Sequence, residues 1–399
     1  MGGGIYVGTQ AEGPNFSHCV ITGNRATNGG GMYCVNSGPD FDTCAFTANS
    51  AGAGGGLYWS SLVSGQPAPI FRNCNINGNS ADSGGGAYCY SEQSGGLVPT
   101  FANCTISGNW AQSWGGGVGC QHAAPILKNC VINGNKADQE GGGVSLRSYS
   151  SPQFMHCTVC NDSANLGGGA YCAGSSQASF INTIIAFSEG AGIHFDDGAD
   201  NVQVIHCNLF GNSGGEVAGN VPDGVGEDHI DTVNANGDPC DSFFNIFFDP
   251  LFADPEGDFH LTLCSHSIGA AADCVSAPDS DIEGTGRPSP EGTLPDIGAY
   301  EDTIRSNSLP AVEDLAIWFD GDTTVILKWQ SIEGIDGYEV SRCDSAFGNY
   351  EVIDTVGTAP WQGEGLVGCS RRFYRVTSVC LEDLQVPLRK RTHLTFRRK

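Results

Sequence analysis

The chain has 399 residues, of which 44 are acidic and 18 basic, so its formal net charge is −26. So acidic a surface repels nucleic acid, anionic lipid and acidic polysaccharide, and we expect no nucleic-acid partner. Glycine accounts for 58 residues without a Gly-X-Y period, which excludes collagen, and no apolar run is long enough for a transmembrane segment.

An internal repeat of 24 to 30 residues runs through the first half of the chain. Each copy has an apolar residue three positions before an anchor, another two positions after it, and Asn, Asp or Ser five positions after it. A proline stands five positions before the anchor in the first six copies. The anchors are Cys19, Cys44, Cys74, Cys104, Cys130, Cys157, Thr183 and Cys207.

Each copy continues with glycines and a short strand, such as Ala87-Tyr88-Cys89. Cys74 and Ile76 share parity and point to one face of a strand, whereas Tyr88 points outside. Glycine and proline in these copies exclude a helical solenoid. Because one unit cannot bury its apolar face alone, we predict an all-β parallel β-helix, about 40 Å long for the eight aligned rungs.

Eleven cysteines fall in two register-matched columns, the anchors and a second set of Cys34, Cys89, Cys120 and Cys172. Neighbouring Cβ atoms on parallel strands would lie about 4.8 Å apart, whereas a disulfide needs about 3.8 Å. We therefore expect buried free thiols and no zinc site. The asparagine column predicts a hydrogen-bonded turn stack. His18, His156 and His206 share a register with asparagines, which predicts an outward polar ladder rather than a catalytic cluster.

Beyond Asn212 the repeat fades into an acidic, glycine-rich stretch. We expect residues 240–302 to close the coil, because the end of a β-helix exposes unpaired strand edges. Asp279, Asp281 and Glu283 form a candidate Ca²⁺ site, with a solvated acidic loop as the alternative. At the other end, Met1 leads into glycines in mid-rung, so we expect further sequence upstream.

Residues 303–309 form a polar linker, and residues 310–381 change to alternating strands that fit a seven-stranded sandwich. Cys343 and Cys369 end and precede neighbouring antiparallel strands of that sandwich, so we predict a disulfide between them, worth about 3 kcal/mol. Two buried free cysteines are the alternative. The basic tail at 382–399 is expected to be disordered.

Three resemblances agree with these patterns. The repeats over 1–215, as in Phe71-Arg72-Asn73-Cys74, resemble those of bacterial polymorphic outer-membrane proteins. Residues 249–301, with Asp296-Ile297-Gly298-Ala299-Tyr300-Glu301, resemble the end of secreted β-helix proteins that bear a variable C-terminal anchor, although Ser265–Gly269 departs from their pattern. Residues 310–381 resemble a fibronectin type III domain. The resemblances imply a right-handed, pectate-lyase-like solenoid and an extracellular or bacterial cell-surface location, associated with the outer membrane.

For function, we expect a non-catalytic protein that serves adhesion or binds a surface glycan or protein partner. Insertions at Ser60–Ala68 and Tyr90–Val98 place the binding face of the solenoid there. The candidate binding residues are Tyr58, Trp59, Tyr88 and Tyr90, unless Trp59 fills the interior column of Cys34 and Cys89.

The rival function is a polysaccharide lyase or glycoside hydrolase on the same fold. Its carboxylates could come only from the cluster of Asp196, Asp197 and Asp200. A Ca²⁺-stabilised structural surface protein is the third possibility, and apart from Ca²⁺ no cofactor is expected.

Overall fold

The computed structural model describes residues 2–8, 13–63, 65–92, 98–199, 201–273 and 277–303, and from the C-terminal part 312, 314–320, 324–332, 335, 337–343, 351–364 and 373–379. The chain divides into two compact units, residues 1–261 with 265–306, and residues 262–264 with 307–399. Among the described residues, no helix has the length and apolar character needed to cross a membrane.

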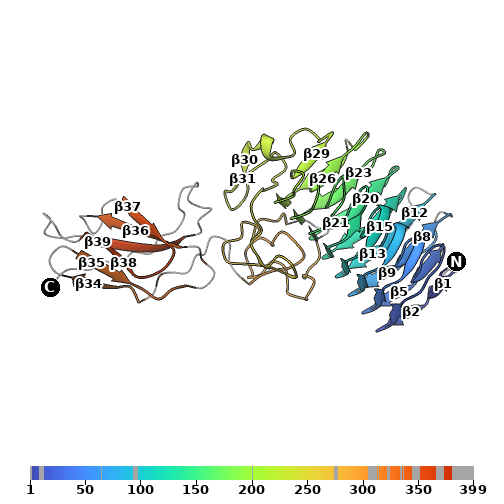
Figure 1. Cartoon of the computed structure of the whole chain (residues 1–399), viewed down its shortest axis with the longest axis horizontal. Coiled ribbons are helices and arrows are strands. Elements are labelled where there is room, and N and C mark those ends of the chain that lie inside the picture. The colour runs from blue at the N-terminus through green and yellow to red at the C-terminus, as the bar shows by residue number, and fades with distance from the viewer. Residues whose placement is uncertain are drawn as a thin grey trace. The chain divides into compact units, whose positions relative to one another are not determined.

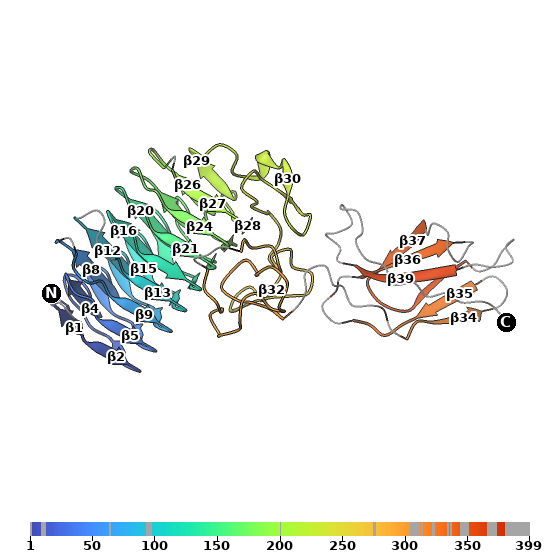
Figure 2. The same cartoon turned by 180° about the vertical axis from the view of Figure 1, so that it is seen from behind.

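The first unit contains a parallel β-coil in which every rung contributes one strand to each of several sheets (Figures 1 and 2). We call the nine-stranded sheet sheet A. Its strands, in spatial order, are β1 (Ile5–Val7), β4 (Met32–Val35), β8 (Leu57–Ser61), β12 (Ala87–Ser91), β16 (Val118–Gln121), β20 (Val144–Arg147), β23 (Ala170–Cys172), β26 (Ile193–Phe195) and β29 (Val217–Gly219).

Sheets B and C have eight strands each and meet at a corner. Sheet B consists of β2 (Asn15–Ser17), β5 (Asp40–Asp42), β9 (Ile70–Arg72), β13 (Thr100–Ala102), β17 (Ile126–Lys128), β21 (Gln153–Met155), β24 (Ser179–Ile181) and β27 (Gln203–Ile205). Sheet C consists of β3 (Val20–Thr22), β6 (Ala45–Thr47), β10 (Asn75–Asn77), β14 (Thr105–Ser107), β18 (Val131–Asn133), β22 (Thr158–Cys160), β25 (Ile184–Ala186) and β28 (Asn208–Phe210).

A fourth, shorter sheet, sheet D, lies between sheets C and A on four of the rungs. Its strands are β7 (Ser50–Ala53), β11 (Ser80–Ser83), β15 (Trp110–Trp114) and β19 (Lys136–Ala137). The glycines that follow sheet D are required by close packing of the backbone. A Cβ on Gly55 would lie 2.5 Å from the carbonyl oxygens of both Ser80 and Gly85 on the next rung. The repeated glycines therefore let one rung lie directly on the next.

The coil interior confirms the predicted columns. Ile76 pairs in register with Ile106, and Ile106 with Ile132, and all three are buried. Phe71 stacks on Phe41 and Phe101 with ring centroids 5.2 and 4.8 Å apart. The anchor cysteines from Cys44 to Cys157 are buried free thiols, as expected. Cys264, outside these columns, is disulfide-bonded.

The asparagine column is a continuous amide ladder. Asn79 Nδ2 donates to Asn109 Oδ1 at 3.0 Å, and Asn109 Nδ2 donates to Asn135 Oδ1 at 2.9 Å. Each amide also donates to a carbonyl of the preceding rung, as Asn109 Nδ2 does to Ile76 O at 2.9 Å. The ladder thus satisfies the polar groups of the turn without exposing them to water.

The corner between sheets B and C is a single residue in the left-handed conformation, which asparagine tolerates better than most residues. Its φ lies between 49° and 55° at His18, Thr43, Asn73, Asn103, Asn129, His156, Asn182 and His206. His156 is fully buried beneath the segment after the coil, yet it keeps its place in the predicted outward polar ladder, since its Nε2 lies 2.9 Å from Asn182 Nδ2 on the next rung. His206 stacks on Phe244, with centroids 4.9 Å apart.

The segment after the coil covers one strand edge at the end of the coil and also one side of the coil. Ile246 caps the end of sheet C, where its N–H donates to Cys207 O and its carbonyl accepts from Leu209 N. The following residues do not stay at the end but pack on the outer face of sheet C. This segment includes the 3₁₀ turn η1 (Glu227–His229) and the pairs β30 (Thr232–Val233) with β31 (Pro239–Cys240) and β32 (Phe252–Asp254) with β33 (Asp258–Leu261).

The second unit contains two antiparallel three-stranded sheets. One consists of β34 (Ala316–Asp320), β35 (Thr324–Lys328) and β38 (Trp361–Glu364), and the other of β37 (Glu351–Val356), β36 (Gly337–Cys343) and β39 (Phe373–Val379). Trp329, Tyr338 and Trp361 lie in its core. Cys343 ends β36, whereas Cys369 and the tail at 382–399 lie outside the described residues, so the Cys343–Cys369 disulfide stays a prediction.

Candidate functional site

The outer face of sheet A carries a continuous stack of flat side chains. Neighbouring rings lie 5.0 to 5.7 Å apart from Tyr6 to Trp114, the Arg147 guanidinium lies 5.0 Å from the Trp114 centroid and 5.9 Å from that of Tyr171, and His194 continues the stack. In order, the members are Tyr6, Tyr33, Tyr58, Tyr88, Trp114, Arg147, Tyr171 and His194. We call them the outer ladder.

Two rungs join the outer ladder through side chains from elsewhere on the rung, because their own outward positions are small. Gly119 and Ser145 occupy those positions. A Cβ on Gly119 would lie 2.8 Å from Trp114 Cζ3, so glycine makes room for the indole. Arg147 is further held by an ion pair with Glu140. An indole therefore fills the ladder at the rung of Gly119, and two cation–π contacts of Arg147 fill it at the rung of Ser145.

Most of the predicted binding residues pack in the coil interior or in the outer ladder and present no free ring face. Trp59 is 3% exposed and pairs in register with Cys34 and Cys89, so it fills the interior column and is not a surface residue. Tyr58 has one ring face against Tyr33 and the other against Tyr88. Since stacking leaves only ring edges exposed, the ladder offers no free aromatic face at Tyr58 or Tyr88.

Tyr90 lies on β12, two residues beyond the ladder member Tyr88. Its hydroxyl donates to Glu92 Oε1 at 3.2 Å, and its ring meets His122 edge to face, with centroids 6.2 Å apart. Tyr58 and Tyr90 are both partly exposed, and of the two only Tyr90 lies outside the face-to-face stack of the described structure.

Sheet D, in contrast, carries an open groove of about 440 Å³ on its outer side. One column of the groove consists of Arg25, Ser50, Ser80 and Trp110, which are paired across successive rungs. The remaining lining residues are Ala26, Ala51, Ala81, Gly52 and Asp82. Small residues on the middle rungs between Arg25 and Trp110 create the hollow.

Trp110 gives the groove a free aromatic surface. The side chain is 41% exposed, and its Nε1 donates to Asp138 Oδ1 on the following rung at 3.1 Å. This bond orients the indole in the absence of any ligand. The sequence interpretation passed over Trp110, although one signal was present: it replaces the Ser50 and Ser80 of the preceding copies at an outward position.

Residues 62–221 match the family described as "Right handed beta helix region". The coil is a right-handed β-helix. No curated protein matches the chain, and no solved structure matches it either. The matched range spans the rungs from β9 to β29, including Trp110 and the outer ladder from Tyr88 onwards.

The predicted catalytic carboxylates of the β-helix make structural hydrogen bonds. The Tyr171 hydroxyl donates to Asp196 Oδ2, which lowers the pKa of that carboxyl, and Asp196 Oδ1 accepts from the Asp197 N–H at 2.8 Å. Asp197 Oδ1 accepts from Asn220 Nδ2 at 3.0 Å. Asp200 lies outside the described residues. Asp196 thus anchors the outer ladder through Tyr171.

The predicted Ca²⁺ site is also used structurally. Asp281 is buried, its Oδ1 accepts from the N–H groups of Glu283 and Thr285, and its Oδ2 accepts from that of Glu301, all within 2.9 Å. Asp279 contributes a carbonyl to Arg287 N. Glu283 Oε2 lies 3.6 Å from His260 Nε2. No group of three or more His, Cys, Asp or Glu residues within the described ranges is arranged to hold a metal ion.

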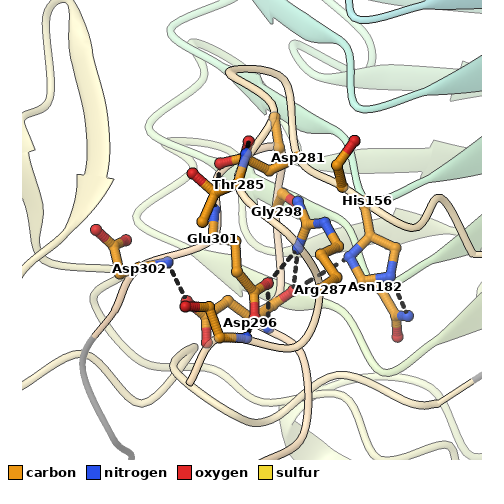
Figure 3. A network of polar contacts seen from close by, with 12 residues as sticks. His156, Asn182, Asp281, Thr285, Arg287, Asp296, Gly298, Glu301 and Asp302 are labelled. Carbon is orange, nitrogen blue, oxygen red and sulfur yellow. Dashed lines mark hydrogen bonds and ion pairs between the residues drawn. The ribbon is translucent and has the colours of Figure 1, made fainter. Parts of the chain in front are cut away.

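Arg287 is the centre of a buried polar network that fastens the closing segment (Figure 3). It forms an ion pair with Glu301 at 2.7 Å, with side-chain exposures of 2% and 0%. It also donates to the carbonyls of Asp296 and Gly298 at 3.2 and 2.9 Å. Burial, reinforced by Glu301, raises the pKa of Asp296 to about 8. His156 of the β-helix joins through Nδ1, 3.2 Å from Asp296 O, and burial lowers its pKa.

Proposed function

We propose that this chain is a non-catalytic carbohydrate-binding protein of the extracellular or bacterial cell surface, and that the groove on sheet D is its binding site. The observation that carries the proposal is Trp110, which presents an exposed indole at one end of an open, polar groove. An aromatic face packs against the C–H faces of a sugar ring, while hydroxyl and carboxylate groups bond its hydroxyls.

The preset orientation of Trp110 favours binding. Because Asp138 already holds the indole, little side-chain freedom is lost when a ligand stacks on it. The outer ladder does not offer this, since its rings stack on one another. Ser50, Ser80 and Asp82 supply donors and acceptors within the same groove.

Two features support the extracellular location. The repeats and the closing segment resemble secreted bacterial surface proteins, and the disulfide at Cys264 suits an oxidising compartment. Adhesion would then follow from glycan binding by a surface-attached chain.

The test is a glycan array probed with the whole chain and with two tryptophan variants. Trp110→Ala should abolish the signals. Trp318→Ala removes a tryptophan that is 48% exposed in the second unit and serves as the matched control, so its signals should be unchanged. The absence of any bound glycan, or equal losses in both variants, would refute the proposal.

The rival activity is tested on the same glycans. Each bound glycan is incubated with the chain and its products are analysed by mass spectrometry. We expect the glycans to stay intact. Cleavage of many glycan molecules by each protein molecule would show an enzymatic function instead of a binding function.

A further inference from the structure

The groove on sheet D is longer along the β-helix axis than across it. Its first column spans four successive rungs from Arg25 to Trp110, roughly 14 Å at the spacing of parallel strands. Across the groove the lining runs from Ser50 to Gly52, about 7 Å along one strand. A linear chain lying parallel to the axis fits these proportions better than a branched or compact ligand.

The charges of the lining select against ionic ligands. Arg25 and Asp82 are the two charged residues of the groove, and their charges cancel. The part of the chain that carries the groove, residues 1–188, has 8 acidic and 5 basic residues, so its surface offers no positive charge excess to attract a polyanion. A polycation would be attracted to the chain as a whole but would meet Arg25 at one end. The groove therefore suits an uncharged ligand.

The spacing of the polar groups follows the rungs. Ser50 and Ser80 occupy the same column on consecutive rungs and pair directly, so their hydroxyls repeat at roughly 4.8 Å. An extended β-1,4-linked pyranose chain advances by a slightly longer distance for each sugar unit, with successive units flipped. Each sugar unit would then meet one rung, with the terminal unit stacked on Trp110.

We propose that the groove binds an uncharged, extended β-linked polysaccharide parallel to the β-helix axis, one sugar unit per rung over about four rungs. The inference rests on the proposed carbohydrate-binding function and adds the class, direction and length of the ligand. It also predicts which position of the chain can block the site.

That position is Ser80. It neighbours Trp110 on the next rung and points into the middle of the groove. In Ser80→Tyr the new ring would stack on Trp110, as the tyrosines of the outer ladder stack on one another, and would cover the free indole face. Asn75→Tyr is the matched control, since Asn75 is exposed on the same rung but belongs to sheet C.

The experiment is calorimetric titration of the whole chain with oligomers of two to six units. The probes are β-1,4-linked glucose and N-acetylglucosamine, with α-1,4-linked glucose and oligogalacturonate for comparison. We expect the affinity for at least one β-linked series to rise roughly tenfold between two and four units and then to level off. The α-linked and charged series should bind at least tenfold more weakly. Ser80→Tyr should abolish binding, whereas Asn75→Tyr should retain it.

The outcomes separate this inference from the proposed function. If glycans bind in a Trp110-dependent manner but without dependence on length, or if the charged or α-linked series binds equally well, the inference fails and the proposed function stands. Binding by Ser80→Tyr at the affinity of the unaltered chain also overturns the inference. If no glycan on the array binds, both fail.

Discussion

The coil of the β-helix and the segment that closes it both bury polar groups, but they pair these groups with different chemistry. In the coil, neutral amides repeat from rung to rung and each bonds the next. In the closing segment, Arg287 and Glu301 form a single buried ion pair with no repeat, and the backbone carbonyl and N–H of Asp296 bond to its two partners. In a repeated neutral ladder, many similar hydrogen bonds each contribute a part of the stabilisation. A buried ionic network depends on a few charges, and each of them is strongly destabilising without its partner.

The largest effect on stability is expected at the buried ion pair of Arg287 and Glu301. Arg287→Met would leave the Glu301 carboxylate buried without its partner, at a cost of about 3–5 kcal/mol. Native-state hydrogen exchange should show residues 252–302 losing protection before the coil does. Arg72→Met is the control, because its pair with Asp40 is exposed and should contribute less than about 1 kcal/mol. Equal losses of stability in Arg287→Met and Arg72→Met would contradict the expected difference between a buried and an exposed ion pair.

The next largest effect concerns one step of the amide ladder. Asn109→Ala would leave the buried Asn79 backbone N–H without its acceptor and would remove the bond to the Ile76 carbonyl, and each buried unsatisfied group costs about 1–3 kcal/mol. We expect a reduced urea midpoint for unfolding of the coil. Asn77→Ala, on the exposed face of the same sheet region, should leave the midpoint nearly unchanged. If Asn109→Ala is equally harmless, the ladder is not a source of stability.

Asp162 places an ionisable carboxyl group in the otherwise neutral amide ladder of the coil. Its Oδ1 accepts from Asn135, whereas its buried Oδ2 makes no hydrogen bond among the described residues. Burial raises its pKa well above the ordinary value of 3.8. The stability that Asp162 contributes is thus fully present below its unfolded pKa and is lost as pH rises toward the folded pKa.

Asp162→Asn should therefore stabilise the chain at pH 7 and have a smaller effect at pH 4. The asparagine restores a neutral amide and removes the free energy needed to keep the carboxyl protonated. Urea unfolding at several pH values measures the difference. The mirror variant, Asn135→Asp, should destabilise increasingly with pH. A stability difference between Asp162→Asn and the unaltered chain that does not change with pH would refute a raised pKa.

The smallest effect on stability is expected in the groove. Trp110 is 41% exposed and bonds one surface carboxylate, so Trp110→Ala should change the unfolding free energy by less than about 1 kcal/mol. Trp114→Ala removes stacking with Tyr88 and the Arg147 guanidinium and should cost more. Thermal unfolding of both variants provides the comparison, and a larger loss for Trp110 would mean that its role is structural.

The sequence by itself determined the β-helix, its rung register, its thiol columns and its amide ladder. These features depend on contacts between equivalent positions of neighbouring copies, so alignment of the copies already reveals which residues touch. Ile76, Ile106 and Ile132 could be placed in this way, as could Asn79 and Asn109.

Only the tertiary structure decided the contacts between residues that lie at different positions in the rung or far apart in the chain. The pairing of Trp59 with Cys34 and Cys89 depends on which way one strand faces, and the stacking of Trp114 over Gly119 crosses two sheets. The closing segment was expected at the end of the coil, where Ile246 lies, yet the residues after Ile246 pack on the side of sheet C. The reason is that outward positions on the later rungs are apolar, as at Val131 and Ile184, whereas Asn75 and Asn77 occupy them earlier. The groove exists for the same kind of reason: small side chains on two rungs form a hollow only when the rungs between Arg25 and Trp110 are stacked in space.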